Sequence, residues 1–588
     1  MCGIVGVIGR DACGKVFSGL KSLEYRGYDS WGVCFPKGKE IENERHTGKI
    51  SDAGNSFPEN PELSLGHTRW ATHGGISEKN AHPHLSNNGQ IALVHNGIVE
   101  NFSALKKALA SKGFKFYSET DSEVIVNLIQ GKTGKAKSFE EAVRLALLEI
   151  EGSYAIAAIR LGEKKIVCAR NGSPLVLGIG GENNEKVFFA ASDASAFISS
   201  TKKAIFLEDD SMAVLDSGVN VYSVASGKKM PFKIRELKWD ARQAQKGNYA
   251  HFMLKEISEQ PETIARAIEQ PEQEFREFVS AVNGAKNIFI TGCGTSFHAC
   301  LSASYFFSAI AKKQAVPVLA SEFSNYAPLL GKGSLVIGVS QSGETADVLE
   351  ALKRAKASGA KIAGIVNVMD SSVMRLSNYS LLMNSGPEIC VLSTKTFTSQ
   401  LALLLLLAFA VAGREKEGRE LILETARQSK KILGSNAAKA EKLAKTLAQK
   451  QNIFVIGRGL AFPAALESAL KIKEVSYIHA EGFAGGELKH GSIALIEEGV
   501  PAIVLSTPET AKEVESNAIE MKSRGAFIIS AGSVETEQAD YAFALPGLGY
   551  ANPIALVLPM QLLAYRIALE KNLDPDRPRN LAKSVTVK

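Results

Sequence analysis

Several features that would assign this chain to a special class of protein are missing from its sequence. Lys and Arg number 68 against 62 Asp and Glu, a net charge of only +6 over 588 residues, and no basic run resembles a nucleic-acid-binding patch. Seven cysteines form no CxxC pair and are odd in number, which argues for a reducing compartment and against a disulfide framework. We therefore expect a globular protein that binds no nucleic acid; a small phosphate-bearing ligand needs no larger positive charge than this.

Long apolar runs are missing as well. The longest, Leu401 to Gly413, has 13 residues, whereas a membrane helix needs about 20. It predicts a buried core helix. The first residues, MCGIVGVIGRDACGK, lack the basic start and the long apolar stretch of a signal peptide. We expect a cytoplasmic protein without a membrane segment.

The length suggests roughly three or four domains of about 150 residues each. Up to about residue 240, short β-branched runs such as Gly3–Ile8 and Gln90–His95 are separated by helical stretches, which predicts an α+β domain. From about residue 285, apolar strands such as Asn287–Thr291 and Ser334–Ser340 alternate with longer helical patterns, the order of parallel βαβ units. The polar stretch ARQAQKGN between them predicts a linker.

The second half contains an internal repeat. NIFITGCGTSFHACL at Asn287 is echoed by NIFVIGRGLAFPAAL at Asn452, 165 residues later (452 − 287), and Glu344-Thr345 return at the same offset as Glu509-Thr510. We interpret this as two copies of one doubly wound α/β (αβα) unit. The predicted segments are 1–240, a linker 241–250, 251–425, 426–575 and a tail 576–588.

One segment of the first copy has the composition of an anion site. The strand ending at Val339 runs into SQSGET (340–345) and then a helical pattern, so hydroxyls and N–H groups gather at a helix N-terminus. Ser and Thr also favour a plain N-cap turn, and this segment alone leaves both interpretations open. The second copy has STPET there and lacks the glycine. Hydroxyl-rich loops at Thr295-Ser296 and Ser393–Lys395 favour phosphate binding in the first copy.

The second copy concentrates acid and base groups. A carboxylate, an ammonium and an imidazole close together could perform acid–base work on a sugar, although each group alone is also typical of a solvated helix face. The residues concerned are Lys471, Lys473, Glu474, His479, Glu481, Glu487, Lys489 and His490.

The motifs SQSGET, STKTFTSQ, LKIKEVSYIHAE, GELKHG and RPRNLAKSVTV together resemble the glutamine–fructose-6-phosphate aminotransferase (isomerizing) family, collinearly over essentially the whole chain. The resemblance implies that the repeats are SIS (sugar isomerase) domains. It implies that Lys583 forms a Schiff base, Glu474 moves a proton between C1 and C2, Lys471 assists, and His490 opens the sugar ring, a histidine that family members can borrow from a neighbouring subunit. The implied sugar phosphate site consists of Thr295, Ser296, Ser340, Gln341, Ser342, Thr345, Val391 and Ser393.

The N-terminal half offers a nucleophile. Removal of Met1 would leave Cys2 with a thiol and a free α-amine, whose pKa of about 7.7–8.0 suits a base. Met-Cys alone is a weak signal, but CGIVGVIG with LEYRGYDS (23–30) resembles the class II glutamine amidotransferases. That resemblance implies an α+β N-terminal-nucleophile hydrolase (αββα) domain ahead of the two SIS domains.

The same resemblance implies how glutamine is held. Arg69 would bind the carboxylate, Asp121 the α-ammonium, and Asn96 with Gly97 would form the oxyanion hole; an ordinary surface ion pair is the alternative for Arg69 and Asp121. Trp70, Thr72, His73 and His82 would line the site. Histidines 67, 73, 82 and 84 fit no common zinc spacing, so we expect no metal. Trp31 stands where the family usually has a small residue, which leaves the packing near the nucleophile open.

The resemblance thus implies an enzyme that makes L-glutamate and D-glucosamine 6-phosphate from L-glutamine and D-fructose 6-phosphate, the first step of amino sugar (UDP-N-acetylglucosamine) biosynthesis. Ammonia would pass internally, without metal, nucleotide or flavin, in a homodimer or larger assembly. Another class II amidotransferase would need a phosphoribosyltransferase loop or an ATP-binding domain, and we find neither, nor a GxxxxGK[ST] loop. A non-catalytic sugar phosphate sensor would not need Cys2, Glu474, His490 and Lys583.

Overall fold

The computed structural model describes residues 2–54, 61–71, 73–181, 186–237 and 245–586. Its contacts divide the chain into two compact units, Met1–Gln245 with Ala582–Lys588, and Lys246–Leu581. The predicted linker 241–250 includes residues 241–244, which lie outside the described residues. The segment boundaries given above stay a prediction.

The first unit is built on two antiparallel sheets. One has the order β15-β11-β9-β10-β1-β4-β2-β3 and the other β14-β13-β12-β8-β7-β6-β5. The strands of the first sheet are β1 (Gly3–Ile8), β2 (Ser30–Lys37), β3 (Glu40–Thr47), β4 (Leu63–Arg69), β9 (Val176–Gly180), β10 (Val187–Ala191), β11 (Lys203–Phe206) and β15 (Arg235–Glu236). Those of the second are β5 (His84–Leu85), β6 (Ile91–Val99), β7 (Gly152–Arg160), β8 (Ile166–Asn171), β12 (Ser211–Leu215), β13 (Val219–Ser223) and β14 (Lys229–Met230).

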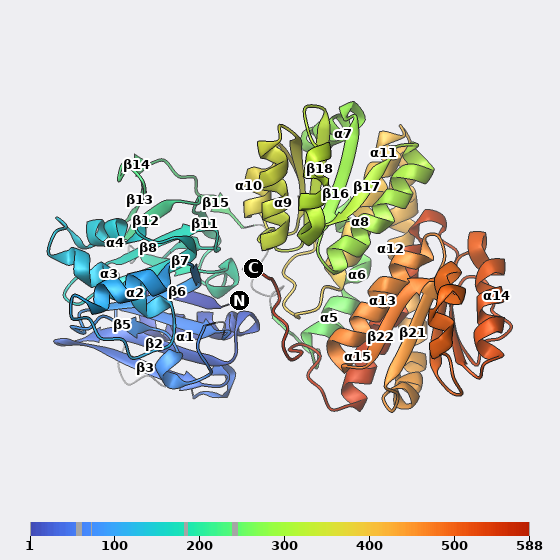
Figure 1. Ribbon diagram of the computed structural model, residues 1–588, viewed down its shortest axis with the longest axis horizontal. Helices are drawn as coiled ribbons and strands as arrows, with labels where there is room; N and C mark the ends of the chain where they lie inside the picture. Colours follow the sequence, from blue (N-terminus) through green and yellow to red (C-terminus); the bar gives the residue numbers. More distant parts are fainter. Residues whose placement is uncertain (1, 55–60, 72, 182–185, 238–244, 587–588) are drawn as a thin grey trace. The chain divides into compact units, whose positions relative to one another are not determined.

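Helices cover the outer faces of these sheets (Figure 1). Side chains of β1 alternate between two clusters: Ile4 and Ile8 lie in the core between the sheets, whereas Val5 and Val7 pack on the side of α1. A third cluster joins the second sheet to α3 and α4. The helices are α1 (Ala12–Ser22), α2 (Phe102–Ala110), α3 (Ser122–Thr133) and α4 (Phe139–Leu147). The predicted αββα architecture is confirmed.

The second unit contains two parallel sheets with the same strand order, β17-β16-β18-β19-β20 and β22-β21-β23-β24-β25. The predicted repeat is visible in their first strands, because β16 begins at Asn287 and β21 at Asn452. The strands are β16 (Asn287–Gly292), β17 (Ala315–Leu319), β18 (Ser334–Ser340), β19 (Lys361–Val366), β20 (Tyr379–Leu382), β21 (Asn452–Gly457), β22 (His479–Ala484), β23 (Pro501–Ser506), β24 (Phe527–Gly532) and β25 (Tyr541–Ala544).

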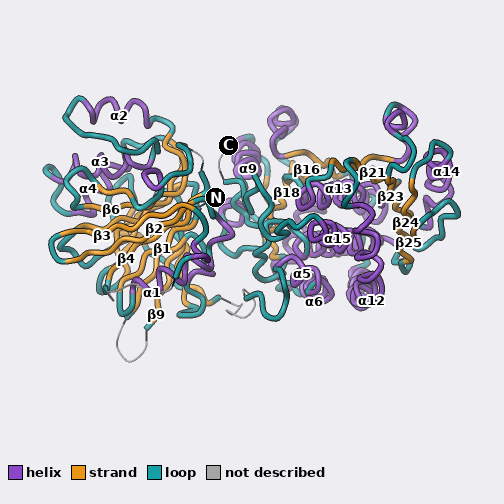
Figure 2. The backbone as a smooth tube through the Cα atoms, turned by 90° about the horizontal axis from the view of Figure 1, so that it is seen from below, coloured by secondary structure: helices purple, strands orange, loops and turns teal. Residues whose placement is uncertain are grey.

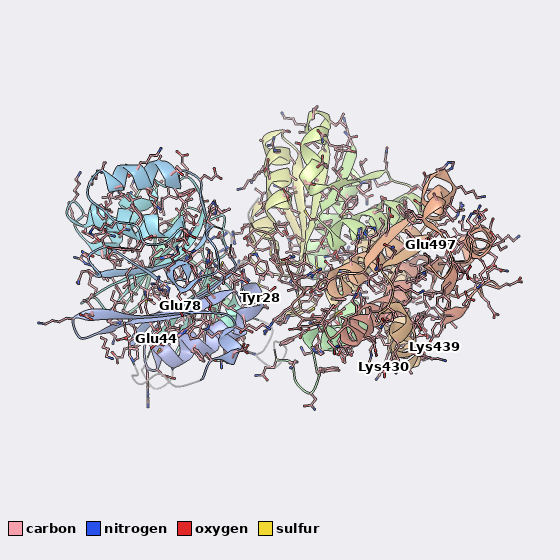
Figure 3. All side chains as sticks on the ribbon, turned by 60° about the horizontal axis from the view of Figure 1, so that its bottom comes forward. Tyr28, Glu44, Glu78, Lys430, Lys439 and Glu497 are labelled. Carbon is pink, nitrogen blue, oxygen red and sulfur yellow. The ribbon has the colours of Figure 1, made fainter. Side chains whose placement is uncertain are left out.

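Helices pack against both sheets, as predicted for doubly wound units. They are α5 (Phe252–Ser258), α6 (Gln260–Ala267), α7 (Glu272–Gly284), α8 (Thr295–Phe306), α9 (Ala346–Ala357), α10 (Ser372–Leu376), α11 (Lys395–Val411), α12 (Glu415–Leu447), α13 (Ala461–Ser476), α14 (Ala511–Lys522) and α15 (Asn552–Glu570). On the long helix α12, Ile422 and Ile432 are buried, whereas Lys430 and Lys439 are exposed (Figure 3). Figure 2 shows α12 beside α15, which it contacts.

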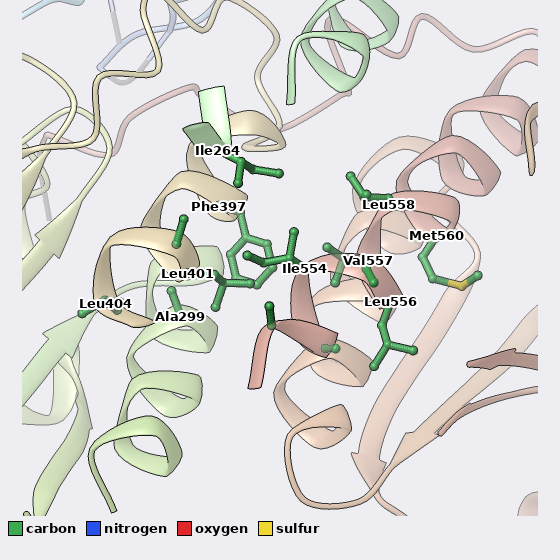
Figure 4. Packing of buried hydrophobic residues seen from close by; sticks show 14 of the residues in the cluster. Ile264, Ala299, Phe397, Leu401, Leu404, Ile554, Leu556, Val557, Leu558 and Met560 are labelled. Atoms are coloured by element: carbon green, nitrogen blue, oxygen red, sulfur yellow. The ribbon is translucent and has the colours of Figure 1, made fainter. Parts of the chain in front are cut away.

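Two apolar helices form the centre of this unit. The predicted core helix is α11, which begins six residues earlier than the apolar run and buries Phe397, Leu401 and Leu404 (Figure 4). The segment Gly549–Glu570 is long and apolar enough to cross a membrane, but 89% of its apolar window is buried inside the protein. Such burial is typical of a core helix.

Truncating the core of the second unit tests this packing. Leu404→Ala removes a fully buried side chain of α11, and we expect it to destabilise that unit by about 2–5 kcal/mol. Hydrogen exchange measured by mass spectrometry should become faster in α11, whereas the exchange rates of β6 and β7 in the first unit should not change. Leu423→Ala on α12, a leucine that is 44% exposed, is the matched control. Equal protection of α11 in both variants would contradict the assignment of Leu404 to the core.

Candidate active site

Cys2 lies directly before β1, the strand that pairs with β4. The antiparallel register sets Gly3 opposite Thr68, so the residues just before β1 and just after β4 are neighbours. The backbone N–H of Trp70 donates to Cys2 Sγ at 3.2 Å, and the thiol lies 3.5 Å from the Trp70 carbonyl oxygen. Sequence-distant strand ends thus bring a sulfur and a backbone donor together.

Other thiols are poor nucleophiles in this fold. Burial raises the pKa of Cys13 to about 12, that of Cys168 to about 12 and that of Cys293 to about 11. Cys2 is partly exposed. The thiols of Cys13, Cys168 and Cys293 therefore stay protonated at neutral pH, and a protonated thiol is a weaker nucleophile than a thiolate.

Asn96 is held against the nucleophile's own residue. Its Nδ2 donates to the carbonyl oxygen of Cys2 at 2.9 Å and to Ser192 Oγ at 2.8 Å. His67 Nε2 donates to Asn96 Oδ1 at 2.9 Å, which fixes the amide orientation. Ser192 and His67 were not among the predicted site residues. His67 belongs to the GHTRWATHG motif and could have been found, whereas no local signal marks Ser192.

Gly97 occupies a position that only glycine fits. Its φ is +132°, and a Cβ would lie 2.0 Å from the carbonyl oxygen of Ser153 on the neighbouring strand β7. Gly97 pairs with Tyr154 in that ladder. The strand β6 runs on to Val99, beyond the predicted end at His95, because this pairing with β7 continues to Gly152.

Arg69 is the last residue of β4 and is 3% exposed. Its guanidinium donates to the carbonyl oxygens of residues 73, 74 and 75 at 2.6, 3.0 and 3.2 Å. Burial lowers the pKa of Arg69, while Cys2, Asp29 and Asp121 act in the opposite direction. These acidic groups therefore lie near the guanidinium. Because Arg69 is buried, the alternative of an ordinary surface ion pair for this residue does not hold.

Asp121 is also buried, with 4% of its surface exposed. Its Oδ2 accepts the backbone N–H of Val99 at 2.8 Å. Ser122 Oγ lies 3.4 Å from Oδ1. The carboxylate is thus anchored to the end of β6, two residues after Gly97.

Four buried histidines cluster beside Asn96, and the backbone N–H of His95 joins the cluster by donating to His82 Nδ1 at 3.4 Å. The ring centroids of His67 and His82 are 4.2 Å apart and those of His82 and His84 are 4.6 Å apart. Burial lowers the pKa of His67 to about 3 and also lowers the pKa of His82, His84 and His95. The cluster is therefore uncharged at neutral pH. Among the residues that the structure describes, no group of three or more His, Cys, Asp or Glu is arranged to hold a metal ion.

The remaining predicted glutamine contacts lie near the same loop. The Trp70 ring packs edge-on against Tyr28 at 5.1 Å, and His73 packs against Phe102 at 5.6 Å. Thr72 lies outside the described residues.

The unusual Trp31 is accommodated on β2. Its ring packs edge-on against Phe17 of α1 at 5.8 Å and stacks on His46 of β3 at 4.5 Å. It belongs to the cluster between the first sheet and α1. The large ring therefore packs in the layer between the first sheet and α1.

In the second unit, two hydroxyl-bearing segments follow neighbouring strands of one sheet. Thr295 and Ser296, which were predicted in a loop, are the first residues of α8. β16 lies between β17 and β18, so the chain leaves β16 toward one side and reaches β18 on the other. In such doubly wound sheets, ligands bind at this switch point, outside the carboxyl ends of the strands. The segment after β16 carries Thr295 and Ser296, and the segment from the end of β18 carries Ser340 to Thr345.

The loop after β18 is a tight turn. Ser340 Oγ lies 2.9 Å from Thr345 Oγ1 and accepts the N–H of Gly343 at 3.0 Å. The N–H of Glu344 donates to Ser342 Oγ at 3.1 Å. Thr345 is the N-cap residue of α9, yet its side chain makes no capping hydrogen bond. This weighs against the plain N-cap interpretation, because the first N–H groups of the helix keep no side-chain acceptor.

A third segment, from Glu388 to Thr394, belongs to the same region. Glu388 Oε1 accepts the N–H groups of Thr394 and Thr396 at 3.0 and 3.1 Å. The N–H of Val391 donates to the carbonyl oxygen of Asp576 at 3.2 Å. From α11, Gln400 Nε2 donates to Ser296 Oγ at 3.1 Å, which links this segment's helix to α8.

Lys471 and Glu474 form an ion pair on α13. Lys471 Nζ lies 2.6 Å from Glu474 Oε2, and the lysine is 1% exposed. Burial by itself lowers the pKa of Lys471, but the carboxylates of Glu467 and Glu474 outweigh it and raise the pKa above its ordinary value. The lysine is therefore a cation beside a carboxylate.

The two other predicted catalytic residues belong to different segments of the chain. His490 is exposed at the last residue of the 3-10 helix η7 (Gly485–His490). Lys583 belongs to the segment 582–588, which groups with the first unit. Lys489, another member of the acid–base cluster, pairs with Glu520 at 2.6 Å and is 57% exposed, as a solvated surface predicts.

Comparison with known families identifies both units. Residues 38–242 match the glutamine amidotransferase domain, and residues 282–410 and 446–570 each match the SIS domain. The chain is therefore a glutamine amidotransferase domain joined to two SIS domains. The glutamine–fructose-6-phosphate aminotransferases (isomerizing) of Thermococcus kodakarensis and Chlorobaculum tepidum are 43% and 41% identical to it, each over the full length of both chains. The chain belongs to this family, which confirms the resemblance.

A solved structure supports the fold of the second unit. The C-terminal domain of the glucosamine-fructose-6-phosphate aminotransferase from Francisella tularensis matches with a TM-score of 0.52 and 31% identity. The match covers 56% of this chain and 99% of that one.

Adding a methyl group at Gly97 tests the first site. Gly97→Ala forces a Cβ into the carbonyl oxygen of Ser153 and displaces the backbone N–H beside Asn96. We expect glutamine hydrolysis to fall by about 100-fold or more, the usual cost of losing an oxyanion donor. The measurement is glutamate release, with circular dichroism as the check on folding. Gly54→Ala, where a Cβ meets nothing within 4 Å, should retain the rate; a similar loss in both variants would contradict a specific role for Gly97.

Proposed function

We propose that this chain converts L-glutamine and D-fructose 6-phosphate to L-glutamate and D-glucosamine 6-phosphate. The observation that carries the proposal is the presence of two complementary sites in one chain. The first unit places Cys2 beside Asn96 and close to Arg69. The second unit joins hydroxyl-rich loops at a sheet's switch point to the buried ion pair of Lys471 and Glu474. The family's full-length relatives supply the identity of the substrates.

In the first site Cys2 acts as the nucleophile once Met1 has been removed. The sulfur adds to the side-chain amide carbon of glutamine, and the thiol proton passes to the α-amine and then to the departing nitrogen. Ammonia leaves, and water hydrolyses the resulting thioester to glutamate and free thiol. The Gly97 N–H and Asn96 Nδ2 stabilise the oxyanion in both steps, and Asn96 exchanges one of its two acceptors, the Cys2 carbonyl oxygen or Ser192 Oγ, for the oxyanion.

Glutamine is held at its two charged ends. Arg69 binds the α-carboxylate, because a guanidinium pairs with a carboxylate through two parallel hydrogen bonds. Asp121 binds the α-ammonium. Support comes from the burial of both side chains and from the electrostatic effect of Cys2 and Asp121 on Arg69. Trp70, Thr72, His73 and His82 complete the lining.

In the second site the donors of the loop after β18 bind the phosphate. The residues proposed are Thr295, Ser296, Ser340, Gln341, Ser342, Thr345, Val391 and Ser393. Lys583 forms a Schiff base with the C2 carbonyl and releases water, as a lysine amine does with ketones. Glu474 moves a proton between C1 and C2, Lys471 assists it, and His490 opens the sugar ring.

A tether supports the role of the tail lysine. The N–H of Arg579 donates to the hydroxyl of Tyr477 at 2.7 Å, and the guanidinium lies 4.2 Å from the ring centroid. Tyr477 directly follows α13, the helix that carries Glu474. Lys583 comes four residues after Arg579, and four residues span at most about 14 Å of extended chain.

Ammonia passes internally from the first site to the second. The exposure of His490 supports association into a homodimer or larger assembly, because an exposed histidine is available to a neighbouring copy. The seven cysteines, all free of disulfides, support a cytoplasmic location, where thiols stay reduced.

Blocking the N-terminus tests the nucleophile. An uncleaved N-terminal tag turns the α-amine, with a pKa of about 8, into an amide without basicity. Glutamate release should fall by about 100-fold or more, whereas isomerisation of fructose 6-phosphate to glucose 6-phosphate should continue. Cys2→Ala should behave in the same way, and Cys293→Ala, at another partly exposed thiol, should not. A tagged protein of verified mass that hydrolyses glutamine at the untagged rate would exclude this mechanism.

Removing the tail amine tests the Schiff base. Lys583→Ala should abolish glucosamine 6-phosphate formation while glutamine hydrolysis survives, because the amine serves the sugar half alone. Mass spectrometry of products from amide-labelled glutamine measures both. Lys489→Ala, at the exposed partner of Glu520, is the matched control and should form product normally. Near-normal formation of glucosamine 6-phosphate by the Lys583 variant would contradict the assignment of the Schiff base to this lysine.

A further inference from the structure

A fully buried carboxylate on α13 has no place in the chemistry described so far. Glu467 is 0% exposed. Its Oε1 accepts the hydroxyl of Thr295 at 3.1 Å and lies 3.4 Å from Lys471 Nζ. Its Oε2 accepts His298 Nδ1–H at 2.7 Å. A buried charge is expensive unless it is paired and hydrogen-bonded, and Glu467 is both.

Glu467 shares Lys471 with Glu474. Residues 467, 471 and 474 follow the spacing i, i+4, i+7 and therefore line one face of α13. The ammonium of Lys471 lies between the two carboxylates and also donates to Thr295 Oγ1 at 3.1 Å. Glu474 is the more accessible of the two carboxylates, with a side chain 21% exposed against 0% for Glu467.

The network joins the two repeats. Thr295 and His298 lie on α8, which follows the first strand of the first repeat, while α13 follows the first strand of the second. The two helices pack against each other. The segment that contributes Ser296 to the sugar phosphate site is thereby connected to the helix that carries the acid–base pair.

We propose that Glu467, held by His298 and Thr295, is a positioning residue that keeps Lys471 as an ammonium directed at Glu474 and sets the pH range of sugar isomerisation. The inference rests on the proposed function of this site. With Glu467 present, the trio of two carboxylates and one ammonium has a net negative charge, so Glu474 remains basic although a cation lies 2.6 Å away. Without Glu467, the ammonium would be balanced by Glu474 alone.

The expected effect has a definite sign. Removing a negative charge lowers the pKa of every neighbouring titratable group. The groups that face Lys471 are Glu467 and Glu474 from its own helix and Glu388 from the segment before α11; His298 from α8 faces Glu467. In Glu467→Gln, both the carboxyl of Glu474 and the ammonium of Lys471 should lose their protons at lower pH.

The test is the pH profile of fructose 6-phosphate isomerisation to glucose 6-phosphate. For Glu467→Gln we expect the acidic limb of kcat/KM, which reports ionisation of the Glu474 carboxyl, to move to lower pH by about one unit. At neutral pH kcat should fall by about 10–100-fold with little change in KM. Glu467→Asp keeps the charge and should keep the wild-type limbs. Glutamate release from the same preparations should be unchanged, which checks folding of the chain.

His298 provides a second, independent pair of variants. His298→Leu removes the donor to Glu467 and should lower kcat, whereas His298→Asn retains an N–H donor and should recover most of the rate. These variants decide the matter if Glu467→Gln does not fold. An unshifted acidic limb in Glu467→Gln, with kcat lowered equally at every pH or not at all, would overturn the proposal. Wild-type protein that does not isomerise fructose 6-phosphate would instead overturn the proposed function itself.

Discussion

The pairing of β1 with β4 is the constraint on which the first site depends. Because Gly3 lies opposite Thr68, the residue before β1 must lie beside the chain that leaves β4. β1 is also paired on its other edge, with β10, so neither strand can slip without reversing which side chains face the core. The register thus sets Cys2 against the N–H of Trp70 and, through Asn96, against β6 of the other sheet.

Duplication explains the division of labour in the second unit. Both repeats keep the strand order in which the first strand lies between the second and the third. The first repeat has the glycine turn at Gly343. The second repeat lacks this turn and carries charged residues on its first helix, α13. Because α8 and α13 pack together, a sugar phosphate bound as proposed by the first repeat would lie beside the proposed acid–base residues of the second. In this proposal neither copy alone provides both functions.

Local sequence patterns predicted the helices and strands, but they did not predict the contacts between residues that are far apart in the sequence. Alternation and apolar runs identified β1, β18 and α11, since these signals lie within a few residues. The histidine cluster was not predicted, because residues 67, 82, 84 and 95 meet only through strand pairing and the loop between β4 and β6. His82 shows what the structure adds: the motif suggested a glutamine contact, which stays a prediction, and the ring is 4% exposed and packs against His67 and His84. The contact of Ser192 could not be predicted for the same reason, because Ser192 lies 96 residues from Asn96, whose side-chain amide it contacts.

Buried carboxylates organise the loops that are proposed to bind a dianion. Glu256 accepts the N–H groups of Ile389 and Cys390, Glu388 those of Thr394 and Thr396, and Glu344 that of Ser372. A carboxylate that faced the phosphate would repel it, but one that accepts backbone N–H groups within the loop shapes the loop from within. Loops without strand partners need such internal acceptors, because their N–H groups would otherwise be buried unpaired. The negative charges near the proposed phosphate site are therefore compatible with anion binding, because they fix the loop backbone and leave its other N–H groups for the proposed ligand.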